Sequence, residues 1–136
     1  MFNPLQLLRH YMLCLGFIFL IFPAVNYSKL LFPVATVEAD ITFSALQKLK
    51  VLDQSAPGFK YQAGCQVRGF NLFLLRKKQD SIGSNNPGAQ INASNQQLIS
   101  MAKVGDRLIF DNIRLDCEGG AQGLKWGSLG LTVVPD

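Results

Sequence analysis

The sequence predicts an all-β domain, an antiparallel Ig-like β-sandwich of about six or seven strands, preceded by an N-terminal hydrophobic signal or anchor helix. Three observations lead to this fold class. Apolar and polar residues alternate along several segments of residues 33–136, and turn-forming residues separate these segments. Residues 1–32, in contrast, contain a nearly unbroken apolar run. We therefore divide the chain into residues 1–32, a signal peptide or membrane anchor, and residues 33–136, the β domain.

The N-terminal segment has the features of an export signal. Arg9 precedes an apolar run over residues 11–22, and a positive charge before such a run is typical of a signal peptide. The run is short for a membrane span, which needs about 20 apolar residues. Cleavage by signal peptidase after Ala24 is disfavoured, because the large residue Phe22 would occupy position −3, where a small residue is required. A cleaved signal and a retained anchor both remain open.

Either outcome places the β domain outside the cytoplasm, because Arg9 marks the side of the segment that stays inside. The expected location is the cell envelope, periplasmic or otherwise extracytoplasmic. If the segment is not cleaved, it anchors the protein to the inner membrane.

The first half of the β domain predicts two strands. Residues 34–43 alternate in the manner of a strand. Residues 45–52 fit either a strand or a short helix, and residues 55–58 form a turn. Residues 60–76 are the longest candidate strand, and their apolar positions change parity at Gly69. A glycine at such a change predicts a β-bulge or bend.

The middle of the domain is less regular. Residues 79–90 consist of turn formers throughout and predict a mobile loop. Residues 90–95 fit a short strand, and residues 97–103 fit a short helix or a strand. The order of elements here depends on the strands on either side.

The second half predicts a hairpin. Residues 104–107 form a turn, and residues 108–117 form a strand whose parity shifts at Asp111-Asn112, which predicts another bend. The sequence Glu118-Gly119-Gly120 is typical of a hairpin turn. Residues 124–134 are the last strand, with three apolar residues on one face: Leu129, Leu131 and Val133.

The charge balance argues against nucleic acid as a partner. The chain has 13 Lys and Arg against 9 Asp and Glu, and without Arg9 and Lys29 the excess over residues 33–136 falls to two. The one dense basic stretch is Arg76-Lys77-Lys78, followed by Asp80. Such a stretch at a strand end is typical of a solvated loop, whereas nucleic-acid proteins show a basic stripe.

Two cysteines fall in the β domain, Cys65 and Cys117, each in a predicted strand. An oxidising compartment permits a disulfide between them, provided that their Cα atoms lie within about 7 Å. A disulfide and two independent buried thiols both remain open. Two cysteines without a nearby histidine are weak evidence for zinc, which usually takes four ligands.

No catalytic, cofactor or metal site is predicted. The single histidine, His10, lies in the export segment, so the β domain lacks the commonest acid–base residue. The candidate catalytic carboxylates, Asp106, Asp111, Asp116 and Glu118, cluster in one turn–strand–turn unit, where structural roles explain them, and no EF-hand spacing is present. Trp126, the one tryptophan, is expected to anchor the core or its rim, and would be a binding hot spot if exposed.

Residues 99–114, ISMAKVGDRLIFDNIR, carry a family resemblance. This stretch is similar to the C-terminal β domain of the gliding-motility protein GldM, called PorM in non-gliding species. The family's turn-and-strand pattern is matched by six residues: Lys103, Gly105, Asp106, Phe110, Asp111 and Ile113. Upstream, residues 67–72 match the strand that leads to a family phenylalanine, here Phe70. The resemblance covers about residues 35–136.

The resemblance implies a part of the type IX secretion and gliding machinery of Bacteroidetes, whose last β domain reaches ring lipoproteins. This chain shows one β domain, without the helical domain and the preceding β domains of the family. We therefore expect a non-enzymatic, exported protein–protein interaction module, an accessory or adaptor. It would dock on cell-envelope proteins, with type IX ring lipoproteins or motor subunits as candidates, through sheet edges and the loops 79–90 and 118–123.

The alternative is a periplasmic small-ligand or carbohydrate-binding β-sandwich. An exposed Trp126 beside a concave surface would favour this alternative, and a buried Trp126 would count against it.

Overall fold

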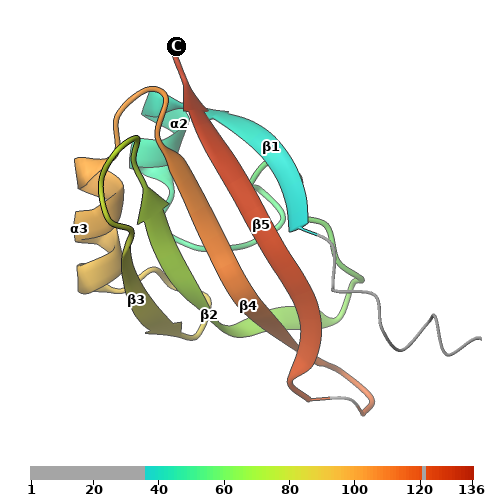
Figure 1. Ribbon diagram of the computed structural model, residues 1–136. Helices are drawn as coiled ribbons and strands as arrows, with labels where there is room; N and C mark the ends of the chain where they lie inside the picture. The colour runs from blue at the N-terminus through green and yellow to red at the C-terminus, as the bar shows by residue number, and fades with distance from the viewer. Residues whose placement is uncertain (1–35, 121) are drawn as a thin grey trace, which may run out of the picture. The chain divides into compact units, whose positions relative to one another are not determined.

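The computed structural model describes residues 36–120 and 122–136, and in this part of the chain five strands and two helices form one compact unit (Figure 1). The strands are β1 (Thr36–Thr42), β2 (Cys65–Leu75), β3 (Ile82–Pro87), β4 (Arg107–Cys117) and β5 (Leu124–Val134). The helices are α2 (Phe43–Lys48) and α3 (Ala93–Met101). The predicted signal or anchor helix in residues 1–32 lies outside the described residues.

The five strands form a single mixed sheet in the order β1-β5-β4-β2-β3. Strand β4 lies between β2 and β5 and is antiparallel to both, and β3 is antiparallel to β2. The first and last strands, β1 and β5, are parallel. The domain is mostly β, as predicted, but the prediction of a two-sheet antiparallel sandwich with six or seven strands is wrong.

The second layer consists of helices and a connecting segment instead of a second sheet. In Figure 1, α2, α3 and the chain between α2 and β2 lie behind the sheet, and the face toward the viewer carries no helix. The buried side chains of this layer include Leu46, Leu52, Phe59 and Ile99, each at most 2% exposed. They pack on the apolar face of the sheet, whose central residues are Phe70, Leu72, Leu108, Phe110, Leu129 and Leu131. The core therefore lies between one face of the sheet and this layer.

Side-chain caps explain why two ambiguous segments are helical. The Thr42 hydroxyl accepts a hydrogen bond from the Ala45 amide (3.3 Å) at the start of α2, and the Asn92 carboxamide oxygen accepts one from the Asn95 amide (3.0 Å) at the start of α3. Such caps satisfy amides that the first helical turn leaves free. The predicted strand at residues 90–95 is therefore wrong, because Asn92 begins a helix there. Neither α2 nor α3 has the length and apolar character that a membrane crossing requires.

The predicted loop at residues 79–90 contains an edge strand. Strand β3 pairs with residues 69–74 of β2 although it is built from turn-forming residues. The fully buried Asn86 holds it in place: its Nδ2 donates to the carbonyls of Gly88 (3.1 Å) and Gln90 (2.9 Å). Its Oδ1 accepts from the Asn92 amide (2.8 Å) and from Asn95 Nδ2 (3.1 Å). This polar network links β3 to α3.

Both bends predicted from parity changes are confirmed. The β2–β4 pairing shifts register around Gly69, and the β4–β5 pairing shifts between Phe110 and Ile113, where Asn112 adopts a φ of 48°. Bulges let the apolar positions return to the core after the parity change. The β4–β5 hairpin, with Leu129, Leu131 and Val133 in the core, is confirmed as well.

Replacing Asn86 with alanine should lower the free energy of unfolding by at least about 2 kcal/mol, because the change leaves several buried polar groups without partners. Urea unfolding of the full chain in a non-ionic detergent measures this loss. Asn85→Ala is the matched control: Asn85 is exposed and donates to Asn71 (2.9 Å) at the surface. Its loss should stay near about 0.5 kcal/mol, and equal losses for both variants would contradict a structural role for the network.

Candidate docking surface on the open face of the sheet

The sheet face opposite the helices is uncovered in the described residues, and we call it the open face. Its side chains alternate with the core residues on each strand, so Phe73 lies between buried Leu72 and Leu74, and Ile109 lies between buried Leu108 and Phe110. The open face is made chiefly of Glu38 and Asp40 (β1), Ser128, Gly130 and Thr132 (β5), Arg107, Ile109, Asp111 and Arg114 (β4), Arg68, Asn71, Phe73 and Leu75 (β2), and Gly83 and Asn85 (β3).

A row of register partners crosses the middle of this face. Phe73 pairs with Gly83 on one side and Ile109 on the other, and Ile109 pairs with Gly130. A Cβ at Gly83 would collide with the Phe73 ring, so the ring occupies the space over this glycine. The half-buried Phe73 and Ile109 thus form a shallow apolar centre.

A second glycine makes room for an ion pair. Glu38 and Arg107 form a two-point salt bridge between the outer strand β1 and the central strand β4. A Cβ at Gly130 would collide with both side chains, so the pair lies across this glycine. The pair is about half exposed (side-chain exposures of 38% and 52%), and such pairs contribute about 1 kcal/mol or less to stability.

Polar contacts continue on both sides of the register shift in β4. The Ser128 hydroxyl donates to Asp111 Oδ1 (2.5 Å), and Asn85 Nδ2 donates to Asn71 Oδ1 (2.9 Å). Toward the β4–β5 hairpin, Arg68 Nη1 lies 3.9 Å from Asp116 Oδ1. The open face therefore has an apolar centre with polar and charged side chains around it, the composition of many protein interfaces.

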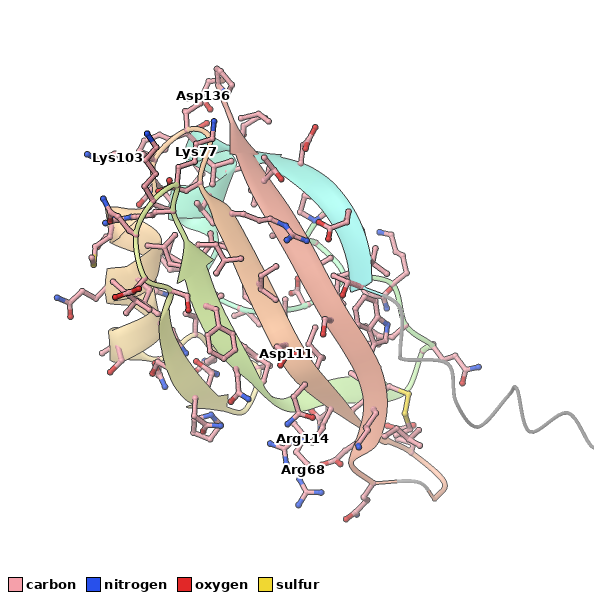
Figure 2. All side chains as sticks on the ribbon, viewed as in Figure 1. Arg68, Lys77, Lys103, Asp111, Arg114 and Asp136 are labelled. Atoms are coloured by element: carbon pink, nitrogen blue, oxygen red, sulfur yellow. A yellow bond between two sulfur atoms is a disulfide. The ribbon has the colours of Figure 1, made fainter. Side chains whose placement is uncertain are left out.

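Basic side chains gather at the hairpin end of the open face. Figure 2 shows Arg68 and Arg114 in the same region of the sheet, and Arg114 is paired in register with Gly69 on β2 and Lys125 on β5. Among the described residues, Arg114 forms no ion pair, and its Nε has no hydrogen-bond partner. This half-buried guanidinium is available to an acidic group of a partner.

The two edge strands of the sheet are β1 and β3. Both present exposed apolar side chains, Val37 (37%) on β1 and Ile82 (42%) on β3. Edge strands also carry backbone groups that can pair with an added strand. The predicted docking segment 79–90 coincides with the β3 edge, and the segment 118–123 is the hairpin turn between β4 and β5.

Cys65 and Cys117 form a disulfide, which resolves the alternative left open by the sequence. The two residues are register partners at the ends of β2 and β4, with Cα atoms 3.9 Å apart. The bond closes a separation of 52 residues and fixes the hairpin end of the sheet.

Six of the seven family-motif residues fall into two groups, buried core residues and residues of a turn. Phe70, Phe110 and Ile113 are fully buried, and the rings of Phe70 and Phe110 lie 5.4 Å apart. Lys103, Gly105 and Asp106 form the turn between α3 and β4: the Lys103 amide donates to Asp106 Oδ2 (2.9 Å), and Gly105 has a φ of 92°.

The same turn is joined to the end of β5. The Gly105 amide donates to the Val133 carbonyl (2.8 Å), and the Val133 amide donates to the Asp106 carbonyl (2.9 Å). Asp111, the remaining motif residue, lies on the open face. The motif thus combines core residues, a structural turn and one surface carboxylate.

Trp126 packs against the core. Its ring lies 4.7 Å from the Phe59 ring in an edge-to-face arrangement, and its Nε1 donates to the Lys60 carbonyl (2.8 Å). The side chain is half-buried. These contacts favour a role as a rim anchor, and the half-buried side chain is neither the exposed nor the buried Trp126 that would decide the small-ligand alternative.

The carboxylates predicted to be structural have structural contacts. Asp106 binds the Lys103 amide, Asp111 binds Ser128, and Asp116 Oδ1 accepts from the Gly123 amide (2.8 Å). In residues 36–120 and 122–136, no group of three or more His, Cys, Asp or Glu side chains is placed to hold a metal ion.

Three ionisable side chains have shifted pKa values, and each belongs to a structural contact outside the open face. Hydrogen bonds from Ser55 hold the pKa of Asp53 below its ordinary value, and hydrogen bonds from Ser44 do the same for the pKa of Asp136. Burial raises the pKa of Tyr61. The two aspartates stabilise the fold at neutral pH, and this contribution is lost as the pH falls through their lowered pKa values.

Sequence reasoning missed several residues of the open face, above all Phe73 and the Glu38–Arg107 pair. A signal for Phe73 was present, because it has the opposite parity to Phe70, Leu72 and Leu74 and so places an aromatic ring on the polar face of β2. The ion pair joins residues 69 positions apart and depends on the parallel pairing of β1 with β5, which no local pattern indicates.

Comparison with known proteins gives one family. Residues 36–125 match the family model of the GldM C-terminal domain. No curated protein matches the chain. The matched range begins at the first residue of β1 and ends at the second residue of β5, so it includes β1 to β4, both helices and only the start of β5.

Proposed function

The chain belongs to the GldM C-terminal domain family, and from this membership we propose that it is an exported, non-enzymatic protein–protein interaction module of the gliding and type IX secretion machinery. The family is a component of that machinery. The proposed role is that of an accessory or adaptor, located in the periplasm or otherwise outside the cytoplasm. Residues 1–32 would direct its export or anchor it to the inner membrane.

Family membership is the observation that carries this proposal, and the open face supports it. A surface with an apolar centre at Phe73 and Ile109 and a polar surround has the composition of many protein interfaces. Arg114, which forms no ion pair among the described residues, would need an acidic group of the partner. The proposed partners are cell-envelope proteins, with type IX ring lipoproteins or motor subunits as the candidates. The β3 edge and the 118–123 hairpin turn border the same face and would extend the contact.

The residue chemistry supports a non-enzymatic role. Residues 36–136 contain no histidine, and the carboxylates of Asp106, Asp111 and Asp116 are each held by a structural hydrogen bond. A general acid or base needs an available titratable group beside a site for substrate. These carboxylates are committed to turns and to strand contacts.

Affinity capture after cross-linking in cells tests the proposal. The tagged full chain is cross-linked, purified and analysed by mass spectrometry, with an unrelated exported protein of matched expression as the control. We expect enrichment of type IX ring lipoproteins or motor subunits with the chain and not with the control. Recovery of the chain alone, at equal cross-linking efficiency, would overturn the proposed function.

A further inference from the structure

A basic pocket lies at the end of the sheet where two turns meet. The turn after β2 supplies Arg76, Lys77 and Gln79, and the turn before β4 supplies Lys103, Gly105 and Asp106. The pocket has a volume of about 260 Å³. Figure 2 shows Lys77 and Lys103 at this same end of the sheet. The basic stretch 76–78, for which the sequence suggested only solvated loop charge, is thus brought together with the family motif turn.

The Arg76–Asp106 pair forms the wall of the pocket. Arg76 is mostly buried (side-chain exposure 20%), its Nη2 donates to the Met101 carbonyl, and its Nε lies 3.5 Å from Asp106 Oδ2. Asp106 is also mostly buried (14%), and the same carboxylate oxygen accepts from the Lys103 amide (2.9 Å). The only carboxylate that lines the pocket is therefore already committed to the arginine and to the turn.

The two lysines of the pocket are left without acidic partners. Both are exposed, and among the described residues neither forms an ion pair. Three cations, Arg76, Lys77 and Lys103, against the single carboxylate of Asp106 give the lining a formal charge of +2. The adjacent Lys78 has a φ of 59°, in the left-handed region that residues with a side chain rarely adopt.

We infer that this pocket binds a phosphate group through the ammonium groups of Lys77 and Lys103, beside the Arg76–Asp106 pair. A phosphate monoester carries a charge of about −1.5 to −2 at neutral pH, which matches the lining. An arginine fork binds carboxylates and phosphates alike, but Arg76 Nη2 already donates to the Met101 carbonyl and Arg76 Nε faces Asp106, so the two lysines supply the free cations. Lysines act as point charges, which suit the tetrahedral phosphate.

This inference is independent of the proposed function, since it concerns the sheet end and not the open face. The chemistry it names, a phosphate group, has two possible sources: free phosphate or the phosphomonoester head group of an envelope lipid. The pocket is open to solvent at exposed Lys77 and Lys103, so either source has access.

Nuclear magnetic resonance titration of the full chain in a maltoside detergent, which contains no phosphate, tests the site. Inorganic phosphate should shift the amide signals of residues 76–79 and 103–106. The double variant Lys77→Gln/Lys103→Gln should bind about tenfold more weakly or worse. The control Lys60→Gln/Lys125→Gln removes the same charge elsewhere and should bind as the wild type does.

Three results would overturn the inference: no phosphate-dependent shift at these amides, equal weakening in the two double variants, or equally tight binding of succinate, a dicarboxylate. Hydrogen exchange of the full chain in vesicles then separates the sources. Protection of residues 76–79 and 103–106 by phosphatidic acid vesicles, and not by phosphatidylcholine vesicles, indicates the lipid head group. Phosphate binding in detergent without such protection indicates free phosphate, and both results support the site.

Discussion

Phe110→Ala is expected to lower the free energy of unfolding by about 3–5 kcal/mol, the range for removal of a fully buried phenylalanine. Phe110 lies on the central strand β4, is completely buried, and packs against Phe70 with ring centroids 5.4 Å apart. Few neighbours can collapse into the cavity that the change leaves, because the sheet holds the backbone on both sides. Urea unfolding followed by tryptophan fluorescence measures the loss.

Ile109→Ala is the matched control for this prediction. Ile109 is the preceding residue of the same strand and lies on the open face. Its removal should cost about 1 kcal/mol or less. Equal losses for the two variants would mean that both faces of the sheet are buried, as in a sandwich, and would contradict a sheet with one core face.

Removal of the disulfide should have an effect of similar size. The Cys65–Cys117 bond closes a separation of 52 residues, and the loss of such a constraint on the unfolded chain costs about 4 kcal/mol on the loop-entropy estimate. The double variant Cys65→Ser/Cys117→Ser should therefore unfold at clearly lower urea concentration than the wild type. The protein treated with dithiothreitol should behave like this variant.

Two checks accompany the disulfide experiment. The stability of the double variant should not respond to dithiothreitol, which controls for effects of the reductant on the rest of the chain. A digest of the unreduced protein should contain a peptide in which Cys65 and Cys117 are joined. Separate thiol peptides in that digest would show that the bond does not form in the cell envelope.

Elements with strong local patterns could be predicted from the sequence. The alternation in residues 124–134 gave β5 and its three core residues, and the parity changes at Gly69 and at Asp111-Asn112 gave both bends. These predictions succeeded because side chains alternate between the two faces of a strand, so a residue's parity alone places it inside or outside. Whether Cys65 pairs with Cys117 could not be decided from the sequence, because the answer depends on the distance between the two residues in the folded chain.

Elements that depend on distant contacts could not be predicted. The sequence Ile82–Pro87 has the composition of a turn, and it forms β3 because β2 offers an edge and because Asn86 is held by groups at residues 88–95. Residues 93–101 form a helix because Asn92 caps their first turn and Leu98 and Ile99 reach the core. Strand β3 extends the single sheet, and the helix takes a place in the layer that covers the core face of the sheet.

The candidate surfaces could be predicted only in part, again because they depend on contacts between residues far apart in the sequence. The basic stretch Arg76-Lys77-Lys78 and the motif residues Lys103 to Asp106 are separately visible in the sequence, but their meeting in one pocket follows from the antiparallel pairing of β2 with β4. On the open face, Phe73 lies over Gly83 and the Glu38–Arg107 pair lies over Gly130. These contacts could not be predicted, because they depend on which residues are cross-strand neighbours of the glycines.

Site-specific photo-cross-linking in cells tests most directly whether the open face is the docking surface. A photoreactive residue is placed at Ile109, in the centre of the open face, or at Gln97, an exposed position of α3 behind the sheet. We expect position 109 to form a covalent adduct that contains a type IX ring lipoprotein or motor subunit, while position 97 forms none at equal expression. An adduct with such a protein from position 97 and not from position 109 would contradict the assignment of the docking surface to the open face.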